Sequence, residues 1–243
     1  MTSLPSRPQA QAAAAPTSEP AVFARFDFNW QALFAERISW LTQPNVVADL
    51  RSDHAGETGA VYIYLGAAWA MALSPQRYTP GAHSFVTEHC ATEEGHLALF
   101  DRLLPREHHS KLLLAWKAAG FALGALPTLV GEAALFCTVE SVETFVEEHY
   151  NEHIVPMERE GAYPELVRLL RHCRDDEVHH KNDAAARWGA PAATASGSGE
   201  SGDGGDSGGS GGGGGSARPW YGRAWAAVVG RGSKAAVAVC RRV

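Results

Sequence analysis

The stretch RDDEVHH, residues 174–180, places three acids and two histidines in seven consecutive positions near the end of a helix-like run. Residues three apart on an α-helix share a face and lie about 5 to 6 Å apart, so Glu177 and His180 form a Glu-x-x-His pair that can ligate a metal ion. A solvated, charged helix end carries the same residue types. One pair does not separate the two readings, so the rest of the chain must decide.

A second pair of the same kind stands in TEEGH, residues 92–96, which holds Glu93 and His96. Each pair follows a predicted helix with an interior glutamate, Glu57 before the first pair and Glu143 before the second. The separations nearly repeat, since 57 to 93 is 36 residues and 143 to 177 is 34 residues. The pattern is therefore a helical hairpin with a glutamate followed by Glu-x-x-His, present twice.

This order is the ligand set of a di-iron or di-manganese carboxylate site inside a four-helix bundle. Four carboxylates balance the charge of two divalent ions, and two neutral imidazoles leave coordination positions open. A buried, unpaired carboxylate in the apolar helix around Glu57 would be costly, and a bound metal removes that cost. We predict that the metal ligands are Glu57, Glu93, His96, Glu143, Glu177 and His180.

Neighbouring acids and histidines leave alternatives open. Glu140 and Glu147 share a helical stripe with Glu143, so periodicity alone does not choose among them. His179 lies two residues after Glu177 and faces elsewhere. Three residues either orient ligands or are exposed, namely Asp53, His54 and Asp176. The remaining histidines are interpreted as ordinary core or surface residues: His83, His89, His108, His109, His153 and His172.

The chain is predicted to be all-α, because its apolar residues recur at helical spacing between Pro and Gly and no run alternates as a strand would. The expected helices cover 28–41, 46–73, 82–104, 132–154 and 164–188, with the fourth ending before Pro156. Between them, the apolar segment 112–130 nearly reaches membrane-spanning length, but Lys117, Pro127 and two glycines interrupt it. We expect a buried crossover or a membrane-dipping hairpin there, with a single span as the alternative.

Composition suggests four parts: a disordered leader at 1–25, a bundle at 26–190, a Gly/Ser-rich flexible linker at 191–218, and an amphipathic helix at 219–243 that docks on the bundle or on a membrane. The net charge of −6 and the lack of a Lys/Arg run argue against nucleic-acid binding. The four cysteines form no C-x-x-C motif. We interpret them as reduced thiols.

Several segments of the sequence resemble those of the demethoxyubiquinone hydroxylases of ubiquinone biosynthesis. They are DHAGETGAVYIY (53–64), EEGHLALFDRLLP (93–105), CTVESVETFVEEHYNEHI (137–154) and RDDEVHH, with a weaker echo in VVGRGSKAAVAVCRRV (228–243). The resemblance places the ligands on the six residues named above and favours Glu143 over Glu140. It also matches His149 and Tyr150 to a His-Tyr pair near the site that is linked to electron delivery.

The resemblance implies a ferritin-like four-helix bundle with two iron ions that uses O2 to hydroxylate the ring of a polyprenyl benzoquinol. Electrons would come from NADH or a partner reductase, although no dinucleotide-binding G-x-G-x-x-G follows a strand here. The expected partners are the quinol lipid, a membrane surface and other quinone-biosynthesis proteins. The expected location is the cytoplasmic face of a bacterial inner membrane, or alternatively the matrix side of the mitochondrial inner membrane.

Two other functions are compatible with the same number and type of ligands or with the same fold. One is an iron-storage or peroxide-scavenging protein of the ferritin and rubrerythrin type, which does not need the apolar crossover. The other is a lipid-binding or assembly protein that uses no metal, against which the presence of all six ligands argues. The glycine-rich insertion before the last helix departs from the family pattern and leaves open a related enzyme acting on another quinone.

Overall fold

The computed structural model describes residues 28–188 and 220–243, and all regular structure in these ranges is helical. The predicted leader and linker lie outside the described residues. The α-helices are α1 (Trp30–Trp40), α2 (Pro44–Leu73), α3 (Pro80–Leu103), α4 (Leu113–Val130), α5 (Glu132–Glu160), α6 (Pro164–Trp188) and α7 (Trp220–Cys240). Two single-turn 3-10 helices follow α2 and α3, namely η2 (Pro75–Arg77) and η3 (Arg106–His108).

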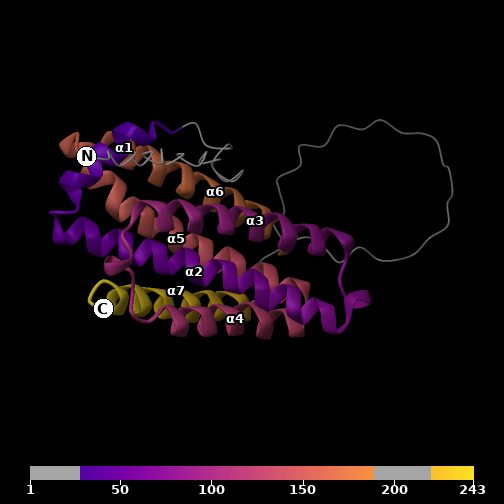
Figure 1. Cartoon of the computed structure of the whole chain (residues 1–243). Coiled ribbons are helices and arrows are strands. Elements are labelled where there is room, and N and C mark those ends of the chain that lie inside the picture. The colour runs from indigo at the N-terminus through magenta and orange to yellow at the C-terminus, as the bar shows by residue number, and fades with distance from the viewer. Residues whose placement is uncertain (1–27, 189–219) are drawn as a thin grey trace, which may run out of the picture.

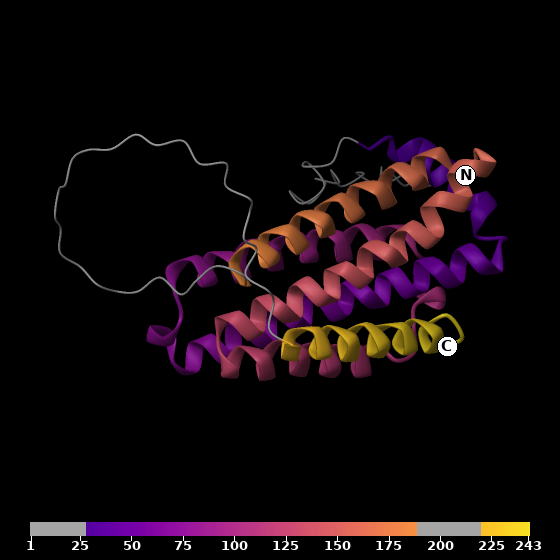
Figure 2. The ribbon, with the colours of Figure 1, turned by 180° about the vertical axis from the view of Figure 1, so that it is seen from behind.

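The helices form three layers that run along one long axis (Figure 1). The hairpins α2–α3 and α5–α6 make the bundle, and α4 is the crossover between them. Seen from either side, α2 and α5 lie in the middle, with α1, α3 and α6 on one side and α4 and α7 on the other (Figure 2). The prediction of an all-α, ferritin-like bundle with a crossover and an extra C-terminal helix is confirmed.

Local sequence signals set most of the helix ends. Prolines occupy the first turn of α2, α3 and α6, where a missing N–H costs nothing. The Thr79 hydroxyl caps α3 by accepting from the Ala82 amide at 3.2 Å. Gly161 ends α5 in the left-handed region at φ 63°, which suits glycine. The Glu36 carboxylate of α1 then accepts from the first amides of α6, at Glu165 and Leu166, at 3.0 Å each.

Two expectations about prolines were wrong. α5 does not end before Pro156 but continues to Glu160. Pro156 is exposed, so the carbonyl group that loses its partner there faces water, which reduces the cost of the break. Pro127 does not interrupt the apolar segment either, because it lies inside the last turn of α4. The segment is one helix and forms no hairpin.

α4 packs closely against α2 through glycines. A Cβ atom added at Gly124 would lie 1.8 Å from the Ile63 carbonyl oxygen, and one added at Gly120 would lie 2.3 Å from that of Gly59. The Gly-x-x-x-Gly spacing therefore serves helix packing within this chain. α4 is long and apolar enough to cross a membrane, and only 28% of it is buried. Core helices of soluble proteins share this length and composition, so α4 does not by itself indicate a span.

Besides a small cluster of Ile63, Val142 and Val229, the apolar core has two larger clusters along the bundle axis. One cluster gathers around Leu50, Phe100 and Ile154, and the other around Tyr64, Phe85 and Leu135. On α2, Glu57 lies between the Leu50 and Tyr64 positions, and α3, α5 and α6 repeat this order of apolar, acidic and apolar residues. The predicted ligands thus occupy a polar slice between two packed ends.

α7 lies along α5 and holds to the bundle by polar contacts at both of its ends. The Trp225 indole donates to the Thr138 hydroxyl at 2.8 Å. Near the other end, the Arg241 guanidinium pairs with Asp49 at 3.0 Å, and Arg51 donates to the Arg241 carbonyl oxygen at 3.3 Å. The C-terminal helix docks on the bundle here; the four-part division with its exact boundaries stays a prediction.

Candidate metal centre

Four helices bring the six predicted ligands together in the middle of the bundle. They fall into two overlapping groups whose oxygen and nitrogen atoms lie within 4.8 Å of one another in each group. Glu93 of α3 and Glu177 of α6 belong to both groups. Glu57 and His96 complete one group, and Glu143 and His180 complete the other. This is the arrangement of two adjacent metal positions that share two bridging carboxylates.

The two Glu-x-x-His pairs face each other across α3 and α6. Nδ1 of His96 lies 3.0 Å from Glu177, and Nδ1 of His180 lies 2.9 Å from Glu93. Each histidine is therefore close to the glutamate of the opposite pair. His96 is also 3.5 Å from Glu57, which ties α2 into the same cluster.

The donor atoms fit divalent metal ions. All six side chains are buried, with residue exposures of 0 to 4%. Apart from their close approaches to the imidazoles of His96 and His180, both Glu93 carboxylate oxygens and one each of Glu57 and Glu177 have no hydrogen-bond partner within the described part of the chain. Buried carboxylate oxygens without partners are costly, and two divalent cations would balance the four negative charges.

Burial and mutual contact shift the proton affinities of the cluster. Burial raises the pKa of Glu57 to about 8 and holds the pKa of Glu143 well above its usual range. Burial opposes protonation of His180, but hydrogen bonds to Glu177 and Glu93 raise its pKa to about 11. Burial acts to raise the pKa of Glu177, but hydrogen bonds from His180 and His96 lower it to about 2. Metal ligation would displace the protons held by these groups.

Neighbouring side chains hold the ligands in place. Asp176 lies 3.0 Å from Nε2 of His96, the ring nitrogen that does not face Glu177. This is the contact that fixes the orientation of a ligating imidazole. The Tyr150 hydroxyl donates to the Glu57 carboxylate. On α3, the His89 ring stacks on His180 with centroids 4.1 Å apart.

A cavity of about 630 Å³ opens beside the cluster, between α2, α4, α5 and α7. The carboxylates of Glu57, Glu93, Glu143 and Glu177 reach its wall. The rest of the lining is mainly small and apolar, including Ile63, Leu123, Val142 and Val229. A small molecule in this space would meet the four carboxylates, further polar groups at Asp53, His149 and Tyr150, and mainly hydrocarbon elsewhere.

The alternatives left open by the sequence separate in the structure. Glu143 enters the cluster, whereas Glu147 pairs with Lys181 and Glu140 faces α7. His179 is exposed. His149 and Tyr150 both line the cavity, but of the two only Tyr150 has a polar contact with a predicted ligand among the described residues. The assignment of ligands and of electron delivery to particular residues remains a prediction.

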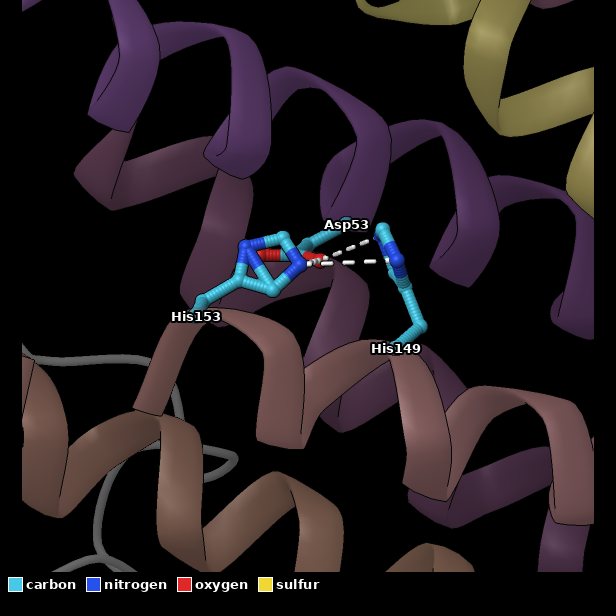
Figure 3. Close-up of side chains that lie close together, drawn as sticks. All are labelled: Asp53, His149 and His153. Carbon is cyan, nitrogen blue, oxygen red and sulfur yellow. Dashed lines mark hydrogen bonds and ion pairs between the residues drawn. The ribbon is translucent and has the colours of Figure 1, made fainter. Parts of the chain in front are cut away.

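Sequence reasoning missed a second polar cluster. His153 was read as an ordinary histidine, yet it lies with His149 and Asp53 in a buried group (Figure 3). The signal was present, because His149 and His153 are four apart on α5 and share a face. His89 was also read as an ordinary histidine, although its ring stacks on the ring of His180.

Comparison with known proteins identifies the family. The family described as "Ubiquinone biosynthesis protein COQ7" matches residues 45–197. The chain belongs to this family. The matched stretch covers α2 to α6, so it includes all four helices that carry the predicted ligands. The resemblance drawn from the motifs is thereby confirmed.

Curated relatives of the COQ7 family carry hydroxylase names. The chain is 37% identical over 136 residues to the rat NADPH-dependent 3-demethoxyubiquinone 3-hydroxylase, mitochondrial, which covers 54% of this chain and 59% of that protein. It is 41% identical over 106 residues to the 3-demethoxyubiquinol 3-hydroxylase of Rhodospirillum rubrum, covering 42% of this chain and 47% of that protein. The yeast 5-demethoxyubiquinone hydroxylase, mitochondrial, is 34% identical over 171 residues, covering 63% of this chain and 66% of that protein. The chain thus matches roughly half to two thirds of each relative's length.

Proposed function

We propose that the protein is a di-iron, O2-dependent monooxygenase that hydroxylates the ring of a demethoxyubiquinol-type polyprenyl quinol. The observation that carries the proposal is a buried cluster of four carboxylates and two histidines that opens into an apolar cavity. Relatives named as demethoxyubiquinone and demethoxyubiquinol hydroxylases support the reaction class.

Each ligand has a distinct position in this proposal. Glu93 and Glu177 would be shared by the two irons, because they belong to both halves of the cluster. Glu57 with His96 and Glu143 with His180 would complete one iron position each. A di-iron centre held by these six residues would supply the O2 chemistry that a ring hydroxylation needs. Asp176 keeps the His96 ring in place through its other nitrogen.

The cavity accounts for the substrate class. Its apolar lining excludes water and accepts a quinol ring, and the four carboxylates define the side on which the reacting carbon must lie. The polyprenyl chain leaves toward α4, whose outer side carries exposed Leu114, Leu126 and Val130. Such a surface suits contact with a membrane, from which a lipid substrate would enter.

Electron supply and location are parts of the same proposal. A reduced nicotinamide is the electron source, in line with the word "NADPH-dependent" in the name of the rat relative. Tyr150, which touches Glu57, and His149, in the cavity wall, are the residues through which the electrons would pass. The enzyme would associate peripherally with the inner membrane that houses quinone biosynthesis, on the cytoplasmic face in a bacterium or the matrix side in a mitochondrion. Other proteins of quinone biosynthesis are its expected partners.

The first test counts iron in anaerobically purified full-length protein by elemental analysis and Mössbauer spectroscopy. Wild type should hold about two irons per chain in a coupled pair, and Glu143→Ala and His180→Ala should each lose that pair. Glu147→Ala is the matched control on α5, because its carboxylate pairs with Lys181 and should leave the iron in place.

Turnover then separates a hydroxylase from a store or a peroxide scavenger. Wild type with a reduced nicotinamide and a demethoxyubiquinol analogue in detergent should release one hydroxylated ring for each O2 consumed. Iron far above two per chain, or peroxide consumption with no ring hydroxylation, would favour the ferritin and rubrerythrin type. A protein that holds no iron after reconstitution would overturn the proposal.

A further inference from the structure

Three buried side chains outside the six predicted ligands converge next to the cavity. Asp53 comes from α2, and His149 and His153 come from one face of α5. Their side chains are 0%, 6% and 1% exposed, respectively. The Asp53 carboxylate points between the two imidazole rings, which stand nearly perpendicular to each other at 89° (Figure 3).

The distances within this group are long for hydrogen bonds. Nε2 of His149 lies 3.3 Å and Nε2 of His153 lies 3.7 Å from the same Asp53 oxygen. Neither Asp53 oxygen has a hydrogen-bond partner among the described residues. A fully buried carboxylate is expected to be satisfied, so the cluster lacks a positive partner at its centre.

The same distances suit three ligands of one metal ion. Metal–nitrogen and metal–oxygen bonds of about 2.0 to 2.1 Å place neighbouring ligand atoms about 2.8 to 3.4 Å apart in octahedral or tetrahedral sites. The shorter distance lies in this range and the longer one exceeds it by a few tenths of an ångström. Two imidazoles and one carboxylate are also a donor set that binds Zn²⁺ and Fe²⁺ with coordination positions left open.

We propose that Asp53, His149 and His153 form a separate site for one divalent transition-metal ion, of the Zn²⁺ or Fe²⁺ type. Asp53 and His149 line the 630 Å³ cavity, so the open coordination positions of the ion face that space. None of the three residues belongs to either group of the six-residue cluster. The inference therefore does not depend on the metal assignment of the six-residue cluster, although it gives a second role to His149, which the proposed electron path also uses.

The surroundings of the two rings support this assignment. Nδ1 of His153 faces the Asp49 carboxylate at 3.5 Å, and Nδ1 of His149 faces Glu152 at 3.7 Å. Ligating histidines commonly turn their second ring nitrogen toward a carboxylate, which orients the ring. Arg241, which directly follows α7, pairs with both Asp49 and Glu152 and so anchors this outer layer.

Two contacts compete with the proposed ion. Nε2 of His153 lies 3.5 Å from Nδ1 of His149. The Ser52 hydroxyl lies 3.0 Å from Nε2 of His149, and the same hydroxyl donates to the Asp49 carbonyl oxygen at 2.7 Å. Nε2 of His149 is then the donor to Ser52, and metal binding at this nitrogen replaces that hydrogen bond. The alternative occupant is a proton on one imidazole, which would pair with Asp53 as a buried ion pair.

The test is a metal count on full-length protein stripped of metal, loaded anaerobically with Co²⁺ and desalted. Wild type should hold about three Co²⁺ per chain, two in the six-residue cluster and one in the additional site. Asp53→Asn and His153→Gln, which keep side-chain volume, should hold about two. The double variant Glu93→Ala, Glu177→Ala removes the two carboxylates common to both halves of the six-residue cluster and should keep about one Co²⁺, with the visible absorption of cobalt bound by nitrogen and oxygen.

The controls keep the result interpretable. His83→Gln removes a histidine from the far end of α3 and should leave the count at the wild-type value. Circular dichroism and the thermal midpoint report whether Asp53→Asn and His153→Gln are folded. The double variant contains neither of these two substitutions. Its Co²⁺ count therefore tests the additional site even if Asp53→Asn and His153→Gln unfold the protein. A wild-type count of about two, or a double variant that holds no Co²⁺, overturns the proposal in favour of the protonated pair.

Discussion

The central helices α2 and α5 are covered on two sides by pairs of helices that differ in almost every physical respect. α3 and α6 bring four of the six predicted ligands to the centre, where all four are buried. α4 and α7 contribute no member of the six-residue cluster and leave a cavity of about 630 Å³. The chemistry of the proposed site therefore lies where these two coverings meet.

The two sides of the bundle also differ in how they are stabilised. The α3/α6 side is stabilised by polar contacts within a closed space, such as the 2.9 Å contact between His180 and Glu93. On the α4/α7 side, small residues let backbones approach, and what they leave open is apolar. A metal centre needs charged donor groups held at fixed positions, whereas a lipid-like substrate needs open space. The two sides of the bundle therefore differ in how tightly they are packed.

The largest effect should follow from breaking the α3/α6 side at a shared ligand. Glu93→Ala removes a carboxylate common to both groups of predicted ligands. Loss of a residue that only orients a ligand lowers metal affinity by at most about 100-fold. We therefore expect the loss of Glu93 to lower the metal affinity by more than that. Isothermal titration with Fe²⁺ under anaerobic conditions measures the change. Glu94→Ala is the matched control, since Glu94 is exposed one position further along α3. Equal affinities in the two variants would remove Glu93 from the site.

The corresponding break on the α4/α7 side is Gly124→Val. A Cβ at this position would lie 1.8 Å from the Ile63 carbonyl oxygen, so α4 must move away from α2. Overpacking of this kind costs roughly 1 to 3 kcal/mol, and we expect a loss of stability at or above the upper end. Denaturant unfolding of the variant measures it. Gly56→Ala on α2 has open space around the new methyl group and should raise the stability by roughly 0.5 to 1 kcal/mol. An unchanged Gly124→Val protein would mean that α4 does not pack as described.

The same comparison explains what the sequence could and could not foretell. That the six residues meet was predictable, because each Glu-x-x-His pair is a local feature of one helix and the 36-residue spacing from Glu57 to Glu93 is nearly repeated in the 34 residues from Glu143 to Glu177. The place of α7 and the cavity beside it were not, because they depend on contacts between helices distant in the chain, such as Trp225 with Thr138. In the cluster of Asp53, His149 and His153, the spacing of the two histidines was visible in the sequence, but their approach to Asp53 depends on how α2 and α5 pack.

The pH dependence of stability tests whether the buried groups on the α3/α6 side hold protons in the folded protein. Glu57 and His180 have pKa values raised to about 8 and about 11, so between pH 6.5 and 8 the folded protein holds protons that the unfolded chain has lost. Stability without metal should therefore fall as pH rises through this window, by on the order of 1 kcal/mol per pH unit for each group. Metal ligation displaces these protons, so metal binding should strengthen with pH and oppose this trend.

Thermal midpoints at pH 6.5 and 8, with chelator and with Co²⁺, measure the two slopes. Glu57→Gln should make the slope without metal shallower, because it removes one of the groups whose pKa is raised. A protein whose stability in chelator rises across this window would contradict the assignment of protons to the buried cluster.

The smallest expected effect concerns the attachment of α7 on the cavity side. Trp225→Phe keeps most of the ring but removes the indole N–H that donates to the Thr138 hydroxyl at 2.8 Å. Losing one such hydrogen bond costs about 0.5 to 1.5 kcal/mol, and because it joins α7 to α5, the loss should appear as faster hydrogen exchange in α7 with little change in α3 or α6. Trp69→Phe is the matched control, since Trp69 is 47% exposed on α2 and packs against Phe121. Faster exchange in α3 and α6 as well would mean that the two coverings are coupled through α5, and the division of the bundle into a closed metal side and an adjustable cavity side would have to be abandoned.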